Sequence, residues 1–211
     1  MKPHTLITTV VSALLAACGQ DAVTVALDDP HRFRAVDGSG AVLDSLPARW
    51  NCVLDQLTGL TWEVKTDQPG LHDWRNTYSW YAPEEAHDEL DYRGTPDGGQ
   101  CAGSDCDTHS LVQAVNQQGW CGHHDWRMPT RDELASISDV RLADEPPTTY
   151  TGVFRNAQAA EYWSGNDYSF QWDAAWAWNF RFGHDRVEWK ATPMHVRLVR
   201  GESVNVERVK D

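Results

Sequence analysis

The chain has 211 residues and a formal net charge of −13, from 31 acidic and 18 basic side chains. Binding to nucleic acid depends on many Lys and Arg contacts with phosphates, so this charge balance argues against a nucleic-acid partner and against an anionic polysaccharide. The length suffices for one sizeable core and predicts a single folded domain.

The first residues have the pattern of an export signal. Lys2 precedes an apolar run from Leu6 to Ala17, which is too short to span a bilayer comfortably. The residues Leu15-Ala16-Ala17-Cys18 resemble the lipobox of bacterial lipoproteins, whose cysteine becomes the lipid-bearing mature N-terminus. The alternative is an ordinary cleavage site beside a free cysteine. We expect a lipoprotein signal peptide over residues 1–17, a lipid on Cys18, a tether over residues 18–30 and export to the bacterial outer membrane or cell surface.

Four cysteines follow Cys18, and an even number in an exported chain predicts two disulfides. Cys101 and Cys106 lie in one polar, Gly-rich stretch, "GGQCAGSDCDTH", where a local bridge forms easily. Cys52 then pairs with Cys121 and closes a long loop. A zinc site is the rival interpretation, but the C-x4-C spacing has no matching second ligand pair.

Two stretches in the first half predict pairs of strands. "FRAVDGSGAVL" has the pattern of a strand, a Gly-rich turn and a second strand. "WNCVLDQLTGLTWEVK" has the same pattern, with Leu60, Trp62 and Val64 alternating on one face. The polar residues 66–103 that follow predict a long loop that is constrained by the Cys101–Cys106 disulfide.

Two helices are predicted next. In "DTHSLVQAVNQQGWCG", Asp107 or Thr108 caps the helix and Gly119 lies past its end. In "MPTRDELASISD", Thr130 is the N-cap and Glu133 completes a capping box. Together with the strands, they predict an α+β fold in which two helices pack on small antiparallel sheets with long loops.

The stretch "AAWAWNFRFG" places a ring at every second position: Trp176, Trp178, Phe180 and Phe182. This period of two predicts that the four rings share one buried face of a strand, with the residues between them on the other face. Residues 183–185 then form the turn, and Val187 and Trp189 alternate with polar residues on the returning strand. "HVRLVRG" predicts the closing strand.

The preceding residues, "NDYSFQWD" from Asn166 to Asp173, show neither alternation nor helical spacing. Rings set among polar turn residues are typical of recognition loops, where Tyr and Trp provide contact area at little entropic cost. The alternative is that one or two of these rings fold back over the core.

Several motifs occur in order along the chain: "CVLDQLTGLTWEVKT", "GWCGHHDWRMPTRDEL", "YWSG…AWAWNF…G…K" and "VRLVRG". Together they resemble the Lcl C-terminal domain family, a bacterial cell-surface branch of the C-type lectin fold. The resemblance covers residues 31–201 and leaves 202–211 as a tail. It implies these scaffold positions: Trp62, Trp126, Arg127, Pro129, Trp163, Trp176, Phe180, Gly183 and Arg197.

The C-terminal third is also similar to the variable regions of proteins diversified by retroelements, which use exposed positions of this fold as a changeable ligand surface. That similarity implies a protein or glycan ligand at a cell surface, as for an adhesin or receptor. The matching ligand-binding positions are Tyr168, Phe170, Trp172, Asn179, Arg181, His184, Arg186, Glu188 and His195.

Two alternative functions also follow from the sequence. The pieces "WR-P-T-x-x-E" and "RLVR" are similar to the formylglycine-generating enzymes, whose thiolate chemistry needs a late cysteine pair. The last cysteine here is Cys121, so no catalytic activity is expected. A structural envelope lipoprotein without a specific ligand is the other alternative.

Calcium-dependent sugar binding is not expected either. Glu145-Pro146-Pro147 and Asn166-Asp167 are similar to the calcium-binding tripeptides of lectins, but the Asn that should follow the first proline is absent. We therefore expect neither a metal nor a cofactor.

Overall fold

The computed structural model describes residues 32–45, 47–84 and 91–202. The predicted signal peptide, the lipidation site Cys18, the tether and residues 203–211 lie outside the described residues. Within the described ranges, none of the helices combines the length and apolar character needed to cross a membrane.

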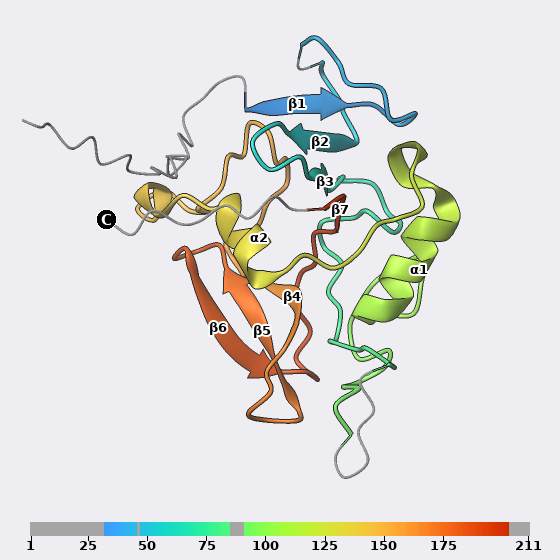
Figure 1. Ribbon diagram of the computed structural model, residues 1–211, viewed down its shortest axis with the longest axis vertical. Helices are drawn as coiled ribbons and strands as arrows, with labels where there is room; N and C mark the ends of the chain where they lie inside the picture. Colours follow the sequence, from blue (N-terminus) through green and yellow to red (C-terminus); the bar gives the residue numbers. More distant parts are fainter. Residues whose placement is uncertain (1–31, 46, 85–90, 203–211) are drawn as a thin grey trace, which may run out of the picture.

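The first sheet is antiparallel, with strand order β1-β2-β3-β7 (Figure 1). Its strands are β1 (Phe33–Val36), β2 (Cys52–Asp55), β3 (Thr61–Glu63) and β7 (Val199–Arg200). The predicted strand after the first Gly-rich turn is reduced to a single bridge between Val36 and Val42. Leu60, Trp62 and Val64 are buried as predicted, but the polar residues between them are buried too.

The second sheet has the order β4-β5-β6 and is also antiparallel. Its strands are β4 (Glu161–Asp167), β5 (Ala174–Asn179) and β6 (His184–Trp189). The turn between β5 and β6 spans residues 180–183, so the predicted turn at 183–185 is wrong. It begins earlier because the Asn179 side chain accepts hydrogen bonds from the N–H groups of Arg181 and Phe182, and Gly183 closes it at φ 76°.

The two predicted helices are confirmed at their caps. α1 (Thr108–Gln118) begins where Asp107 accepts from the N–H of Ser110, and it ends at Gly119 in the left-handed conformation. α2 (Arg131–Ser136) has the predicted capping box of Thr130 and Glu133. Two short 3₁₀ helices follow them, η1 (Trp120–Gly122) and η2 (Val140–Leu142). The predicted α+β fold is confirmed.

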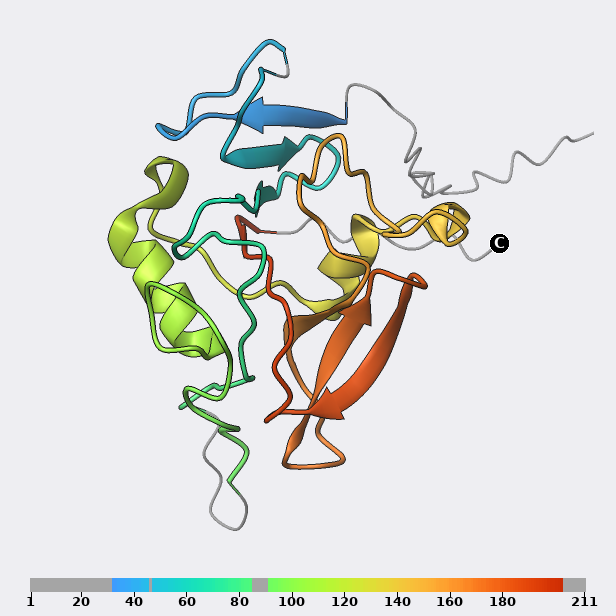
Figure 2. The ribbon, with the colours of Figure 1, turned by 180° about the vertical axis from the view of Figure 1, so that it is seen from behind.

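The three-stranded sheet lies between two hydrophobic clusters. One cluster joins Trp163, Ala175 and Ala177 to the apolar face of α1. The other joins Tyr162, Trp178 and Phe180 to Leu134 and Ile137 of the α2 region. Figures 1 and 2 show α1 at one flank of the molecule and α2 between the two sheets. Both faces of β5 are therefore interior.

Because both faces of β5 are buried, the prediction that all four rings share one buried face holds only in part. Trp178 and Phe180 are buried as predicted, Trp176 is half-buried, and Phe182 is 50% exposed. Phe182 is outside the core because the strand ends at Asn179 and the chain turns. The intervening residues Ala175 and Ala177 are fully buried as well, because they meet the α1 side of the core.

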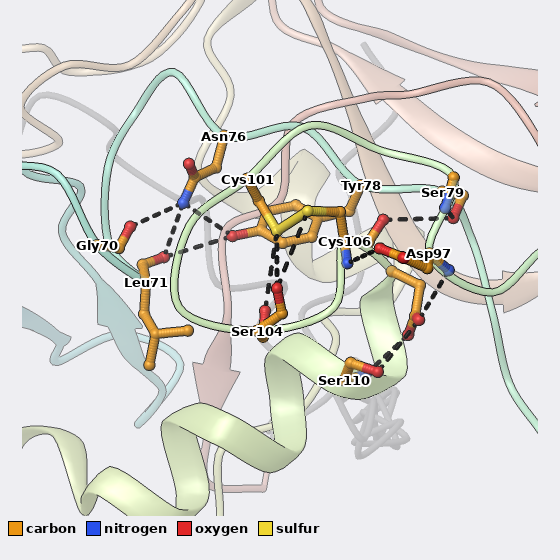
Figure 3. The surroundings of a disulfide bond; sticks show 12 residues. Gly70, Leu71, Asn76, Tyr78, Ser79, Asp97, Cys101, Ser104, Cys106 and Ser110 are labelled. Atoms are coloured by element: carbon orange, nitrogen blue, oxygen red, sulfur yellow. Dashed lines mark hydrogen bonds between the residues drawn. A yellow bond between two sulfur atoms is a disulfide. The ribbon is translucent and has the colours of Figure 1, made fainter.

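Both predicted disulfides are confirmed, Cys52–Cys121 and Cys101–Cys106. The second one closes the loop that leads into α1, where Figure 3 shows it next to Tyr78 and Ser104. The backbone N–H of Cys106 donates to Asp97 (2.8 Å). The backbone N–H of Asp97 in turn donates to the helix-capping carboxylate of Asp107 (3.0 Å). The Cys101–Cys106 disulfide thus helps to hold Asp97 and the capping residue Asp107 at the N-terminus of α1.

A buried charged cluster joins β3 to the segment before β7. The Glu63 carboxylate accepts from Lys65 Nζ (2.9 Å) and the Leu198 N–H (3.0 Å), and it lies 2.8 Å from His72 Nδ1. Arg197 donates to the Glu63 carbonyl oxygen (2.6 Å). Burial raises the pKa of Glu63, but Lys65, His72 and the Leu198 N–H outweigh it and lower that pKa to about 2.

Removing the two disulfides separately should have unequal effects. Replacing Cys52 and Cys121 with Ala frees a loop with a sequence separation of 69, so we expect the unfolding free energy to fall by about 4 kcal/mol. Replacing Cys101 and Cys106 with Ala frees a separation of only 5, for which about 2 kcal/mol is expected. Urea unfolding of the two double variants measures the difference, and equal losses would contradict the loop-length argument.

The Glu63 cluster predicts an acid-dependent stability. Because the folded-state pKa lies below the ordinary value of 4.5, this contribution is fully present above pH 4.5 and is lost as the pH falls through about 2. Glu63→Gln should flatten the pH dependence of the unfolding free energy in that window and lower stability at neutral pH. The exposed variant Glu145→Gln is the control and should leave the profile unchanged.

Candidate functional site

The predicted recognition loop is shorter than expected, because Asn166 and Asp167 belong to β4. Residues 168–173 connect β4 to β5 through two successive turns. The N–H of Gln171 donates to the Tyr168 carbonyl (2.9 Å), and the N–H of Ala174 donates to the Gln171 carbonyl (3.2 Å). This compact backbone leaves Phe170 87% exposed and Trp172 44% exposed.

Tyr168 is half-buried and links the loop to the sheet. Its ring meets the Trp176 ring edge to face at 5.3 Å between centroids, and it lies 5.6 Å from the Phe170 ring. The Arg131 guanidinium covers Trp176 at 4.6 Å. Tyr168 therefore folds back in part, as expected in the alternative interpretation of this loop, and supports the exposed Phe170 ring.

Trp189 adds a further exposed ring, at a position that the sequence analysis did not assign to the ligand-binding surface. It is the partner of Ala174 across β5 and β6, directly after the loop, and it is 55% exposed. β6 lies at one edge of its sheet. We call Tyr168, Phe170, Trp172 and Trp189 the loop-end surface.

Lys190 holds this surface together and was not singled out from the sequence. Its ammonium is 1% exposed and donates to the carbonyl oxygens of Tyr92 (2.6 Å) and Trp172 (2.9 Å). It also pairs with the Asp167 carboxylate at 2.5 Å and lies 4.4 Å from the centroid of the Trp80 ring. One buried cation thus joins β4, the aromatic loop and the segment before α1. Its one sequence signal is its place in the "G…K" motif.

A second exposed group lies at the other end of the β5–β6 hairpin. The Phe182 ring is 50% exposed and is stacked with His184 at 6.1 Å between centroids. The Arg181 guanidinium lies 5.4 Å from the same ring. We call Arg181, Phe182 and His184 the turn-end cluster. Figure 1 shows that the loop and the turn lie at opposite ends of β5.

Two of the residues predicted to bind ligand face inward. Asn179 is 2% exposed and donates to Glu161 Oε1 (2.8 Å), so its predicted exposure is wrong. It is buried because its side chain organises the turn after β5. His195 is half-buried against Tyr162, with ring centroids 5.3 Å apart, and burial lowers the pKa of its imidazole.

The remaining two predicted residues lie on β6 between the two exposed groups. Arg186 pairs with Glu161 of β4 (3.5 Å) and with Glu188 of its own strand (3.2 Å). A strand rises about 3.3 Å per residue, so the five steps from His184 to Trp189 separate the two ends by roughly 16 Å. The structure therefore divides the nine predicted residues instead of bringing them together into one surface.

The residues similar to a calcium motif have other partners. Asn166 Oδ1 accepts from the N–H of Arg131 (2.7 Å) at the start of α2, and Asp167 is bound to Lys190. In the part of the chain that the structure describes, no group of three or more His, Cys, Asp or Glu residues is placed to hold a metal ion.

The family model of the Lcl C-terminal domain matches residues 51–200. The chain belongs to the Lcl C-terminal domain family. A search of curated proteins found no match. The loop-end surface, Lys190 and the turn-end cluster all fall within the matched residues. The α+β architecture is compatible with the C-type-lectin-like fold that this family implies.

The structure accounts for most of the scaffold positions implied by the family resemblance. The most deeply buried of them are Trp62, Trp126, Trp163, Phe180 and Arg197, each 2% exposed or less. Arg127 is partly exposed and forms an ion pair with Glu133 (2.7 Å). The positions that the family resemblance implies therefore lie mainly in the core that supports the exposed rings.

Lys190→Met tests the support of the loop-end surface. It leaves the Asp167 carboxylate without its cation, so we expect the unfolding free energy to fall by about 3 kcal/mol. Adding Asp167→Asn should restore part of that loss. Arg93→Met removes the exposed pair with Asp91 and should lower the unfolding free energy far less, because water screens that pair. Urea unfolding measures all of these variants, and equal losses in Lys190→Met and Arg93→Met would contradict the role given to Lys190.

Proposed function

We propose that this protein is exported, anchored by a lipid on Cys18 and displayed at a bacterial cell surface, where it binds a protein or glycan ligand through the loop-end surface. The observation that carries the proposal is the exposure of Phe170, Trp172 and Trp189 at one end of the β5–β6 hairpin. Most of the protein's other tryptophans are buried or half-buried.

The energetics of such a surface favour binding. A large aromatic side chain buries about 150–250 Å² when it is fully covered, and a few aromatic anchors supply most of the affinity of many interfaces. The loop backbone is held by its two turns and by Lys190, so little conformational entropy remains to be lost on binding. A rigid loop with exposed rings therefore has the properties of a preorganised contact surface.

The proposal assigns no catalytic step. The chemistry of the formylglycine-generating enzymes needs a free thiolate, whereas the four cysteines of the described domain are paired as Cys52–Cys121 and Cys101–Cys106. The polar residues near the aromatic loop are engaged in ion pairs and hydrogen bonds that support it, as Lys190 and Asp167 illustrate.

A screen of glycans and cell-surface proteins with the purified mature protein tests the proposal. Phe170→Ala, Trp172→Ala and Trp189→Ala should each weaken binding of any specific ligand by about tenfold or more, the loss expected for a binding anchor. Thermal unfolding should show that these exposed positions tolerate the change.

Phe182→Ala is the matched control, because Phe182 is equally exposed but belongs to the turn-end cluster. It should leave the affinity unchanged. Ligand binding that is lost in Phe182→Ala and retained in the three loop-end variants would overturn the assignment of the surface.

A further inference from the structure

We propose that the ligand of the loop-end surface is a protein segment that presents Lys or Arg side chains to the exposed Trp172 and Trp189 rings, with Asp173 as a counter-ion. This inference rests on the proposed function and narrows its ligand to one chemical class.

Many aromatic rings of the domain already have a Lys or Arg side chain of the same chain close to the ring. Arg155 lies 4.3 Å from the Trp50 ring, Lys190 lies 4.4 Å from the Trp80 ring, and Arg131 lies 4.6 Å from the Trp176 ring. Even Phe182, in the turn-end cluster, has Arg181 at 5.4 Å.

Trp172 and Trp189 differ from these rings. Among the residues that the structure describes, no Lys or Arg lies over either of them, although both rings are exposed. Exposed Trp faces attract ammonium and guanidinium groups through the quadrupole of the ring, and Trp is the strongest of the aromatic residues in this respect. These two rings are therefore open to a cation from a partner.

The charges around the rings have the complementary sign. Asp173 follows Trp172 directly and is half-buried, and its carboxylate accepts from the neutral side-chain amide of Gln171 (3.1 Å). Within the described ranges it forms no ion pair with a Lys or Arg. A carboxylate beside an exposed ring combines a counter-ion and a cation–π partner in one place.

The cations nearest to the loop are already neutralised. Lys190 is buried and bound to Asp167, and Arg186 lies between Glu161 and Glu188. The whole chain carries −13. With these cations neutralised and Asp173 outside the ion pairs of the described residues, the charge beside the loop favours a cation over a polyanion.

A neutral glycan is the alternative ligand for exposed rings. It would stack on Trp172 or Trp189 without depending on Asp173 or on salt concentration. Binding of a basic segment depends on the rings, on Asp173 and on the salt concentration, because its attraction combines ring contact with charge. The dependence on charge therefore separates the two ligand classes.

The test uses the full mature protein and an array of short Lys- and Arg-containing peptides. Each peptide is matched by a copy in which Lys is acetylated and Arg is replaced by citrulline. Neutral oligosaccharides and heparin form two further arms. We expect the cationic peptides to bind about tenfold more tightly than their neutral copies and heparin not to bind. Their affinity should fall as the salt concentration rises.

Variants locate the binding. Trp172→Ala and Trp189→Ala should each weaken binding of the cationic peptides by about tenfold or more, and Asp173→Asn by about threefold with a weaker salt dependence. Asn keeps the acceptor for Gln171, so the loop should retain its turns. Phe182→Ala should have no effect.

Two results would overturn the inference. Equal binding of the neutral copies or of an oligosaccharide, still dependent on Trp172 and Trp189, would refute the cationic ligand and leave the proposed function standing. Absence of any binding that depends on these two rings, in every arm, would refute both.

Discussion

Burial of both faces of β5 is the constraint on which the rest of the domain depends. Ala175 and Ala177 meet the core beside α1, while Trp178 meets the core beside α2. A strand that is covered on both sides cannot offer a flat face to a ligand. What remains accessible is the edge strand β6 and the two ends of the hairpin, and there the exposed rings are found.

Each end of the hairpin is shaped by a buried polar side chain that bonds to backbone groups. At the turn, Asn179 accepts from two N–H groups and sets where β5 stops. At the loop, Lys190 donates to two carbonyl oxygens from distant segments. Buried polar groups must be hydrogen-bonded to be tolerated, so these two residues hold the backbone in defined positions. The rings above them are thereby presented without being part of the core.

Local chemistry was the most reliable guide to the fold. The caps of α1 and α2 and the two disulfides were predicted because each depends on neighbouring residues or on a small set of cysteines. The ring spacing in β5 was a weaker guide. Its period of two identified a strand, but it did not show that the other face, with Ala175 and Ala177, is buried as well, because alanine is equally suited to a tightly packed second core.

The candidate site shows the same division. The sequence by itself determined that a ring-rich connection, predicted at residues 166–173, lies outside the regular pattern, since polar turn residues separate the rings. Only the tertiary structure decided that Trp189 joins that loop, that Asn179 turns inward and that Lys190 ties the loop to β4 and Tyr92. Those outcomes depend on which strand lies at the sheet edge and which distant carbonyl groups meet a buried cation, and such contacts between remote residues have no local sequence pattern.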